Sequence, residues 1–283
     1  MRLVTYASDR GPRAGVQTDQ GVLDAWDMIG SEEGSGLKEL LASGRLDEVK
    51  AAVEAGSGYP LLLGPGGILA PIPDPDKIIC IGLNYRAHAE ETGAEIPKAP
   101  TIFGKYRNAL VPDGATVALP PASRRVDYEA EVAFVIGRRA ASVSVEDALD
   151  HVAGYTLLND LSARDLQGLT MQWMAGKVFD GAAPCGPALV TPDEAGPHDA
   201  IGIAMHVNGE ERQSSSTADL IFSVPELVAT LSTWLTLEPG DIISTGTPSG
   251  VGLAMDPRTW LEDEDELVVS SPVLGELRTK IKR

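Results

Sequence analysis

Cysteine is nearly absent from this sequence: 283 residues contain only Cys80 and Cys185, at positions that form neither a metal-binding nor a disulfide spacing. We therefore expect free thiols and a reducing compartment, the cytoplasm. Long apolar runs are also missing, since none approaches the roughly 20 residues that cross a bilayer. The segment after Met1 lacks the apolar core of a signal peptide. Together these absences predict a protein without disulfides and without a membrane segment.

Positive charge is scarce as well. The chain has 23 lysines and arginines against 41 aspartates and glutamates, which gives a formal net charge of −18. A charge of this sign repels nucleic acid and anionic membranes, so we expect neither as a partner. An anionic small molecule would require a locally positive pocket. Hydrophobic residues at 43% and charged residues at 23% are ordinary for a globular protein.

The first 72 residues have the pattern of a separate small unit. Three short apolar stretches predict the strands of a meander: residues 2–7, 14–19 and 21–26. Residues 37–56 have helical spacing and predict a helix that ends at Gly56. Residues 64–77 are rich in proline and glycine. We therefore predict a small α+β N-terminal domain over 1–72 and a larger domain over 73–283.

The remainder predicts mainly strands. The strand segments are residues 77–83, 128–137, 153–160, 203–213, 237–246 and 265–281. Asn208 and Gly209 predict a hairpin turn, and a short helix is expected from Ser144 to residue 151. The clearest helix spans 223–234, where Ser223 and Glu226 form a capping box. The pattern predicts an α+β protein with a largely antiparallel or mixed sheet, and not a doubly wound fold.

A row of acids interrupts the strand predicted over residues 126–137. Alternate residues of a strand share a face, so Asp127, Glu129 and Glu131 would lie side by side. Either this face is exposed to solvent, or a hard divalent cation such as Mg²⁺ or Mn²⁺ neutralises it. Asp160 ends another predicted strand and would complete a set of three carboxylate ligands. Its alternative role is the N-cap of the helix predicted to follow it.

His88 and Glu91 are three residues apart and would share a face of a helical turn. A carboxylate beside an imidazole fixes its tautomer and raises its basicity, which suits the pair to activate water. The alternative is an ordinary surface histidine. Arg164 and Gln167 would lie on the same helical face and offer donors to a carboxylate or enolate oxygen. The alternative there is a surface arginine paired with Asp165.

Lys177 follows small residues that leave room for a substrate, and its ammonium would stabilise an oxyanion with Asp180 as a partner. An isolated lysine is, however, usually solvated. The glycine-rich loop at 244–252 lacks the lysine of a phosphate-binding loop, so we expect no nucleotide site. Trp173 and Met174 are expected to pack rather than to bind.

Five stretches in this order resemble the fumarylacetoacetate hydrolase family. They are GLNYRAHAEE (82–91), DYEAEVAFVIG (127–137), NDLSARDLQ (159–167), GKVFDGAAPCGP (176–187) and STGTPSGVG (244–252). The resemblance runs from about residue 72 to the end of the sequence. It implies a mixed β-sandwich roll with a metal at its mouth, usually in a homodimer. The small N-terminal unit is similar to the one in many bacterial members.

The resemblance also implies roles for individual residues. It places the metal ligands at Glu129, Glu131 and Asp160, and gives Asp127 the role of orienting a ligand or a metal-bound water. The implied catalytic residues are His88, Glu91 and Lys177, with Asp180 beside them, and the implied substrate contacts are Arg164, Gln167 and Thr247. Cys185 stands where many relatives have a bulkier or polar residue, which would widen the pocket.

From these parts we expect a hydrolase dependent on Mg²⁺ or Mn²⁺ that acts on a small anionic diketo acid. It would cleave a C–C bond of an acylpyruvate, of the fumarylpyruvate type met in aromatic compound catabolism, and release pyruvate or another 2-oxo acid. The same enolate chemistry without attack by water gives a keto–enol tautomerase, an isomerase or an oxaloacetate decarboxylase. His88 and Glu91 do not decide between them, because proton transfer also needs a base. A non-catalytic metal or ligand binder is the alternative from another class.

Overall fold

A ten-stranded sheet is the largest element of the computed structural model, which describes residues 1–31, 33–64 and 66–283. In spatial order its strands are β3 (Gly21–Asp24), β2 (Gly11–Thr18), β1 (Arg2–Ser8), β12 (Ala183–Val190), β10 (Val152–Asn159), β9 (Ala130–Ile136), β15 (Ile242–Ser244), β4 (Ile78–Gly82) and β5 (Thr101–Lys105), with β6 (Leu110–Val111) paired to β12. Most pairs are antiparallel, but β15 and β4 run parallel. The sheet is therefore mixed, as predicted.

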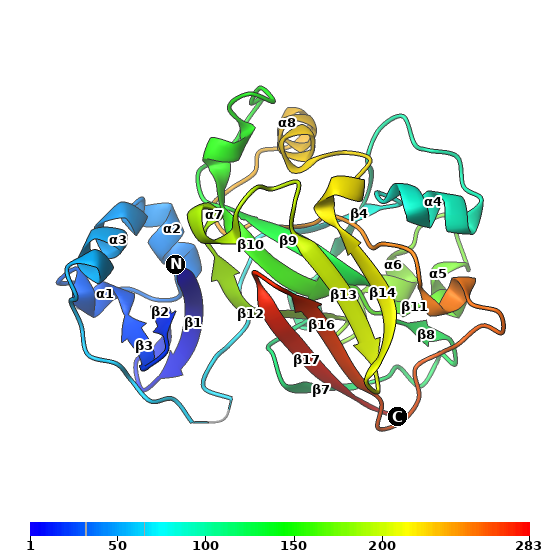
Figure 1. Cartoon of the computed structure of the whole chain (residues 1–283), viewed down its shortest axis with the longest axis horizontal. Helices are drawn as coiled ribbons and strands as arrows, with labels where there is room; N and C mark the ends of the chain where they lie inside the picture. The colour runs from blue at the N-terminus through cyan, green and yellow to red at the C-terminus, as the bar shows by residue number, and fades with distance from the viewer. Residues whose placement is uncertain (32, 65) are drawn as a thin grey trace.

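A second sheet covers the first (Figure 1). Its strands, in order, are β14 (Glu210–Ser216), β13 (Gly202–Val207), β16 (Glu266–Ser271), β17 (Gly275–Lys282) and β7 (Ala115–Ala118). β13 packs on β9 and β16 packs on β10, and a small third sheet joins β11 (Ser162–Ala163) to β8 (Val126–Asp127). Every residue of β9 and β10 is buried, because both are central strands of the large sheet and the second sheet packs on them. The α+β class and the layered roll are confirmed.

The helices are short. They are α1 (Ala25–Met28), α2 (Leu37–Ser43), α3 (Leu46–Glu54), α4 (Arg86–Thr92), α5 (Arg164–Gln167), α6 (Met174–Lys177), α7 (Pro192–Ala195) and α8 (Val224–Trp234). The capping box of α8 is confirmed: the Ser223 amide donates to Glu226 Oε2 at 2.8 Å. The single helix predicted over 37–56 is wrong. Gly44 adopts a left-handed conformation at φ 70° and separates α2 from α3.

One predicted turn is confirmed, and one predicted short helix is not. Asn208 and Gly209 form the hairpin between β13 and β14, with positive φ angles of 53° and 81°. The helix expected from Ser144 is reduced to a 3₁₀ turn over Ala148–His151. Ser144 Oγ nevertheless accepts a hydrogen bond from the amide of Asp147, as a capping residue would.

The N-terminal elements β1–β3 and α1–α3 lie to one side of the main body in Figure 1. They are joined to it, because β1 pairs with β12 through Arg2 opposite Val190 and Leu3 opposite Leu189. The first three strands thus extend the large sheet. The domain boundary near residue 72 remains a prediction.

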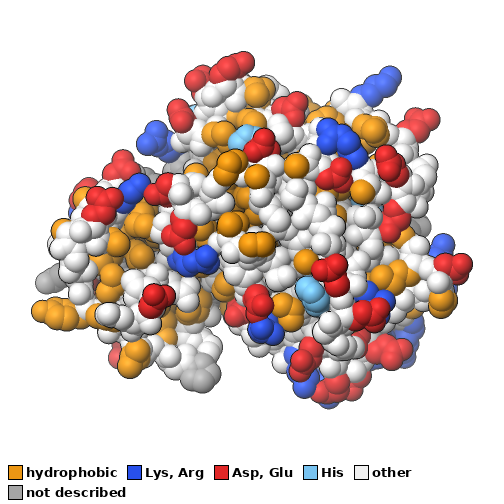
Figure 2. Space-filling model, in the orientation of Figure 1, with side chains coloured by type: hydrophobic (Ala, Val, Ile, Leu, Met, Phe, Trp, Pro, Cys, Tyr) orange, Lys and Arg blue, Asp and Glu red, His pale blue; other side chains and the backbone are white. Residues whose placement is uncertain are grey.

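Charged side chains of both signs are interspersed over the face shown in Figure 2. Cys80 and Cys185 are both buried and unbridged, as expected. Among the helices of the described ranges, none combines the length and the apolar character needed to cross a membrane.

Candidate active site

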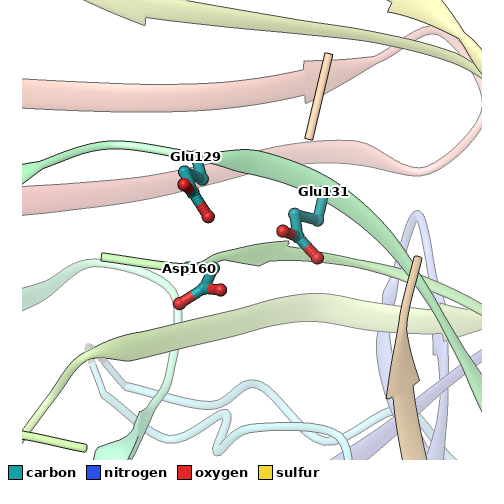
Figure 3. Close-up of side chains that lie close together, drawn as sticks. All are labelled: Glu129, Glu131 and Asp160. Carbon is teal, nitrogen blue, oxygen red and sulfur yellow. The ribbon is translucent and has the colours of Figure 1, made fainter. Parts of the chain in front are cut away.

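Three buried carboxylates gather where β9 begins and β10 ends. Figure 3 shows Glu129, Glu131 and Asp160 directed at a common space, and one oxygen from each lies within 4.8 Å of the others. The register explains the cluster: Glu131 is opposite Leu158, and the Asp160 amide donates to the Glu129 carbonyl at 2.8 Å. Only 6%, 2% and 0% of these residues is exposed, in that order, so the interpretation of a solvent-exposed acidic face is wrong.

Asp127 belongs to a different strand from the other acids. The strand predicted over 126–137 is divided into β8 and β9, and Asp127 is fully buried at the end of β8. Its oxygens accept hydrogen bonds from the amides of Gly252 and Leu253 at 2.8 and 3.0 Å, and from Arg164. Asp127 therefore holds a loop and an arginine in place and is not part of the carboxylate cluster.

The cluster carries opposing electrostatic effects. Burial raises the pKa of Glu131 well above its ordinary value, and the negative charges of Asp160 and Glu129 raise it further. Burial acts in the same direction on Glu129, but Lys177 and Arg164 outweigh it and hold the pKa of that carboxyl well below its usual range. The cluster thus contains one firmly ionised carboxylate and one that ionises with difficulty unless a cation joins it.

Arg164 is a buried connector rather than a surface residue. Its guanidinium donates to Asp127 Oδ2 at 2.8 and 2.9 Å, lies 2.7 Å from Glu129 Oε1, and donates to Gln167 Oε1 at 3.1 Å. The predicted alternative, a surface pair with Asp165, is wrong, because Asp165 accepts from Ser123 instead. With its amide oxygen accepting from Arg164, Gln167 retains its amide N–H groups for the cavity that it lines.

Two further expectations on these segments are wrong. Asp160 is not the N-cap of a helix, since β11 follows it and Ala163 precedes α5. Asp180 is not the partner of Lys177, because its carboxylate accepts from Asn108 at 2.7 Å. Lys177 Nζ instead donates to Glu129 and Asp160 at 2.7 and 2.8 Å. Its ammonium is buried inside the carboxylate cluster.

The predicted pair of His88 and Glu91 is present on α4. His88 Nδ1 lies 3.1 Å from Glu91 Oε2, and Glu91 Oε1 accepts from the amide of Gly250 at 2.8 Å. Gly250 has a φ of 100°, and a Cβ there would lie 2.0 Å from the carbonyl oxygen of Arg212, so only glycine fits. The glycine-rich loop therefore anchors the carboxylate that orients the histidine.

These side chains surround one cavity of 230 Å³. Its lining comprises Ile81, Gly82, Leu83, His88, Ala94, Phe103, Glu129, Glu131, Arg164, Gln167, Trp173, Lys177 and Thr247. A larger cavity of 330 Å³ lies between α2, α3 and the start of β10, but none of the predicted site residues lines it. The smaller cavity is the better candidate, because perturbed ionisable groups converge on it.

Thr247, Trp173 and Cys185 have different relations to this cavity. Thr247 Oγ1 donates to the Ala130 carbonyl at 3.0 Å and accepts from Gln213 at 2.8 Å, so its methyl and hydroxyl are held at the wall. Trp173 packs as expected, but it also faces the cavity. Cys185 does not line the cavity, so the expectation that it widens the pocket is wrong.

Sequence reasoning missed Lys105. Its side chain is completely buried, and its Nζ lies 2.7 Å from Asp160 Oδ1. The same ammonium donates to the carbonyls of Lys177 and Ala182 at 2.5 and 2.9 Å. Lys105 therefore joins the strand end that carries Asp160 to the helix end that carries Lys177. The one available signal was a lysine at the end of the apolar stretch TIFGK.

The donor set fits a hard divalent cation. Three converging carboxylate oxygens suit the oxygen preference and the charge of Mg²⁺ or Mn²⁺, and would leave coordination positions for water and substrate. Asp160 Oδ1 is buried and accepts no well-aligned hydrogen bond from the described residues, although Lys105 lies near it. A cation would also relieve the repulsion that raises the pKa of Glu131.

Known proteins resemble this chain over its whole length. It is 38% identical over 291 residues to oxaloacetate tautomerase FAHD2A, mitochondrial, of Homo sapiens, covering 99% of this chain and 91% of that protein. It is 46% identical over 216 residues to oxaloacetate tautomerase YisK of Bacillus subtilis (strain 168), covering 75% of this chain and 72% of the relative.

Solved structures also resemble this chain over its whole length. A putative HpcE protein from Mycobacterium smegmatis superposes with a TM-score of 0.89 at 35% identity, covering 100% of this chain and 99% of the other. Maleylpyruvate hydrolase from Sphingobium sp. SYK-6, in complex with manganese(II) ion and pyruvate, superposes with a TM-score of 0.79 at 29% identity. The match covers 100% of this chain and 99% of the other. Residues 77–282 match the family model described as fumarylacetoacetate (FAA) hydrolase C-terminal. The chain belongs to the fumarylacetoacetate hydrolase family, a family of enzymes.

Proposed function

We propose that this protein is an oxaloacetate keto–enol tautomerase that depends on Mg²⁺ or Mn²⁺. The observation that carries an enzymatic proton transfer is the pairing of His88 with Glu91 at the same cavity as the buried carboxylate cluster, and the choice of a tautomerase over a hydrolase rests on the relatives. A base, an oxyanion-stabilising ammonium and a cation site are the parts that a proton transfer next to a carbonyl requires. Relatives named oxaloacetate tautomerases, at 38% and 46% identity, support this substrate.

The proposed reaction moves one proton. His88 Nδ1 is occupied by Glu91, which leaves Nε2 to take a proton from C3 of the keto form. The electron pair of the C–H bond becomes the C2–C3 double bond, and negative charge passes to the oxygen on C2. The Lys177 ammonium stabilises that oxygen, and return of the proton from His88 to it gives the enol. Glu129, Glu131 and Asp160 would hold a divalent cation, which would supply further positive charge for the enolate.

The expected C–C hydrolase becomes the second candidate. The relatives favour the tautomerase that the sequence left as an alternative, and tautomerisation needs a base but no attacking water. Hydrolysis keeps one specific support, the manganese- and pyruvate-bound maleylpyruvate hydrolase structure with a TM-score of 0.79. Both reactions would use the same enolate-stabilising residues and would differ in whether water attacks the distal carbonyl.

A product assay separates the candidates. Enol oxaloacetate and a panel of acylpyruvates are incubated with protein and Mn²⁺, and with EDTA, while enol absorbance and pyruvate are followed together. We expect metal-dependent loss of the oxaloacetate enol without pyruvate. Pyruvate from an acylpyruvate would establish the hydrolase, and pyruvate from oxaloacetate in excess of a protein-free sample with Mn²⁺ would establish a decarboxylase. Metal binding without any turnover would indicate a non-catalytic binder.

We also propose a cytoplasmic homodimer. The dimer rests on the family resemblance, and the location rests on the two unbridged buried cysteines. Size-exclusion chromatography with light scattering should give twice the 29.8 kDa mass of one chain. A mass equal to one chain at micromolar concentration would contradict the dimer.

A further inference from the structure

Trp173 lies directly against the backbone of β4. A Cβ placed on Gly82, the last residue of β4, would lie 2.3 Å from Cζ3 and 2.8 Å from Cη2 of the indole. Real Cβ atoms do not approach other carbon atoms so closely, so the indole occupies the space that a side chain at position 82 would fill. Both residues line the 230 Å³ cavity. The absence of a side chain at Gly82 is what allows the indole its present position.

Phe103 supports the indole on β5. The two rings meet edge to face, with centroids 5.7 Å apart and an interplanar angle of 64°. Lys177 Nζ lies 4.9 Å from the centroid of Phe103, within cation–π distance. Indole, phenyl ring and ammonium therefore form one continuous wall that leads from the end of β4 to the carboxylate cluster. Because Phe103 and the backbone of Gly82 both contact the indole, Trp173 would not move aside readily for a longer ligand.

The cavity is small. Its 230 Å³ is below the roughly 300–1,000 Å³ of pockets that enclose drug-sized ligands. A cation and the 2-oxo acid group at the charged end would leave little of this volume for the rest of the substrate. We propose that Trp173 limits substrate length, so that the site accepts four-carbon 2-oxo dicarboxylates and rejects longer homologues. This inference rests on the proposed function for the orientation of the substrate.

A binding series tests the limit without requiring turnover. Calorimetric titration of the Mn²⁺-loaded protein with oxaloacetate, 2-oxoglutarate and 2-oxoadipate compares acids that differ by one methylene each. For the wild type we expect affinity to fall by about tenfold or more for each methylene added beyond four carbons. Trp173→Ala should reduce the difference between the four- and six-carbon acids to about threefold or less, because the missing indole leaves room for the extra methylenes.

The contact with Gly82 supplies a reciprocal test. Gly82→Ala should push the indole into the cavity and weaken even the four-carbon acid, whereas Gly82→Ala with Trp173→Ala should restore its binding. Trp234→Ala is the matched control, because this partly exposed tryptophan ends α8 and does not line the cavity. It should bind all three acids as the wild type does.

Two results would overturn the proposal. One is a wild type that binds 2-oxoadipate as tightly as oxaloacetate. The other is a Trp173→Ala protein that loses affinity for all three acids by the same factor, since the indole would then only support the cavity. A wild type that shows the length dependence but does not tautomerise oxaloacetate would support the length limit and refute the proposed function.

Discussion

Lys177 Nζ lies 2.7 Å from Glu129 Oε2 inside the buried site, so an ammonium of the protein itself already neutralises part of the carboxylate cluster. Burial alone would lower the pKa of this lysine, but Asp160 and Glu129 raise it above the ordinary value, and the ammonium stays charged. A divalent cation would thus join a partly paired set. This pairing explains how three acids can be buried together in the fold.

Replacing Lys177 by methionine should expose the role of this pairing. The change removes the ammonium that Glu129 and Asp160 share and leaves Glu129 only Arg164 and Asp160 only Lys105, which should cost about 3–5 kcal/mol of the free energy of unfolding in the metal-free protein. Turnover of oxaloacetate should fall by about 10²-fold or more, because the enolate oxygen loses a donor. Urea titration and enol absorbance measure the two effects. Lys98→Met, at an exposed position, is the control and should change neither.

Glu131→Gln should alter the pH dependence of stability. Burial and the acidic neighbours raise the pKa of Glu131 in the folded protein. The contribution of Glu131 to the free energy of unfolding is therefore fully present below its unfolded pKa near 4.5, and it is lost as pH rises through its folded pKa. The variant removes this loss and should be more stable than the metal-free wild type at pH 8. The difference in the free energy of unfolding between the variant and the metal-free wild type should grow by up to about 1.4 kcal/mol for each unit that the pH rises. Urea titrations in EDTA between pH 5 and 8 follow it.

The same variant should fail to gain stability from metal. Mn²⁺ at about 100 times its dissociation constant would stabilise the wild type by about 2.7 kcal/mol. Glu131→Gln has lost one anionic oxygen of the cluster and should show little of this gain. An equal gain in both proteins would contradict a role for Glu131 in holding the cation.

His88 and Glu91 should affect catalysis without affecting the metal. We expect His88→Asn to lower kcat by about 10²–10⁴-fold, because the base is lost. Glu91→Gln should lower it by about 10–100-fold, because the histidine loses the carboxylate that orients it. Enol absorbance measures kcat, and calorimetry should show unchanged Mn²⁺ affinity in both variants. Full activity in His88→Asn would remove this residue as the base.

Lys105→Met should destabilise the protein although Lys105 does not touch the cavity. The Lys105 ammonium lies near Asp160 and donates hydrogen bonds to the carbonyls of Lys177 and Ala182. Its loss leaves these buried polar atoms unpaired. Breaking a buried ion pair in this way costs about 3–5 kcal/mol. Urea titration at pH 7 checks the value. A loss within about 0.5 kcal/mol, as expected for a surface substitution, would show that Lys105 has no such role.

The carboxylate cluster could be predicted from the sequence because its signals are local. Period-two spacing aligns Glu129 with Glu131, and an acid at the end of an apolar strand indicates a sheet edge. His88 and Glu91 were equally visible, since residues three apart on a helical turn meet. In each case the partners are close in the chain or belong to strands that pair as a hairpin.

The remaining contacts depend on segments distant in the sequence. Lys105 meets Leu161, Lys177 and Ala182, and Trp173 meets Gly82, across folds of the chain that no local pattern encodes. For the same reason, the pairing of β1 with β12, which extends the large sheet, could not be predicted from the sequence. Asp180 shows the opposite error. Its closeness to Lys177 in sequence indicated a partner, but the chain turns and directs it to Asn108.

The most direct test of the account compares the wild type with Glu129→Gln in one assay. Enol oxaloacetate is mixed with each protein and Mn²⁺, and enol absorbance and pyruvate are recorded together against a protein-free sample. We expect rapid loss of the enol without pyruvate in the wild type, abolished by EDTA, and only the protein-free rate in Glu129→Gln. Equal rates in the two proteins, or pyruvate appearing as fast as the enol disappears, would contradict the proposed metal-dependent tautomerase.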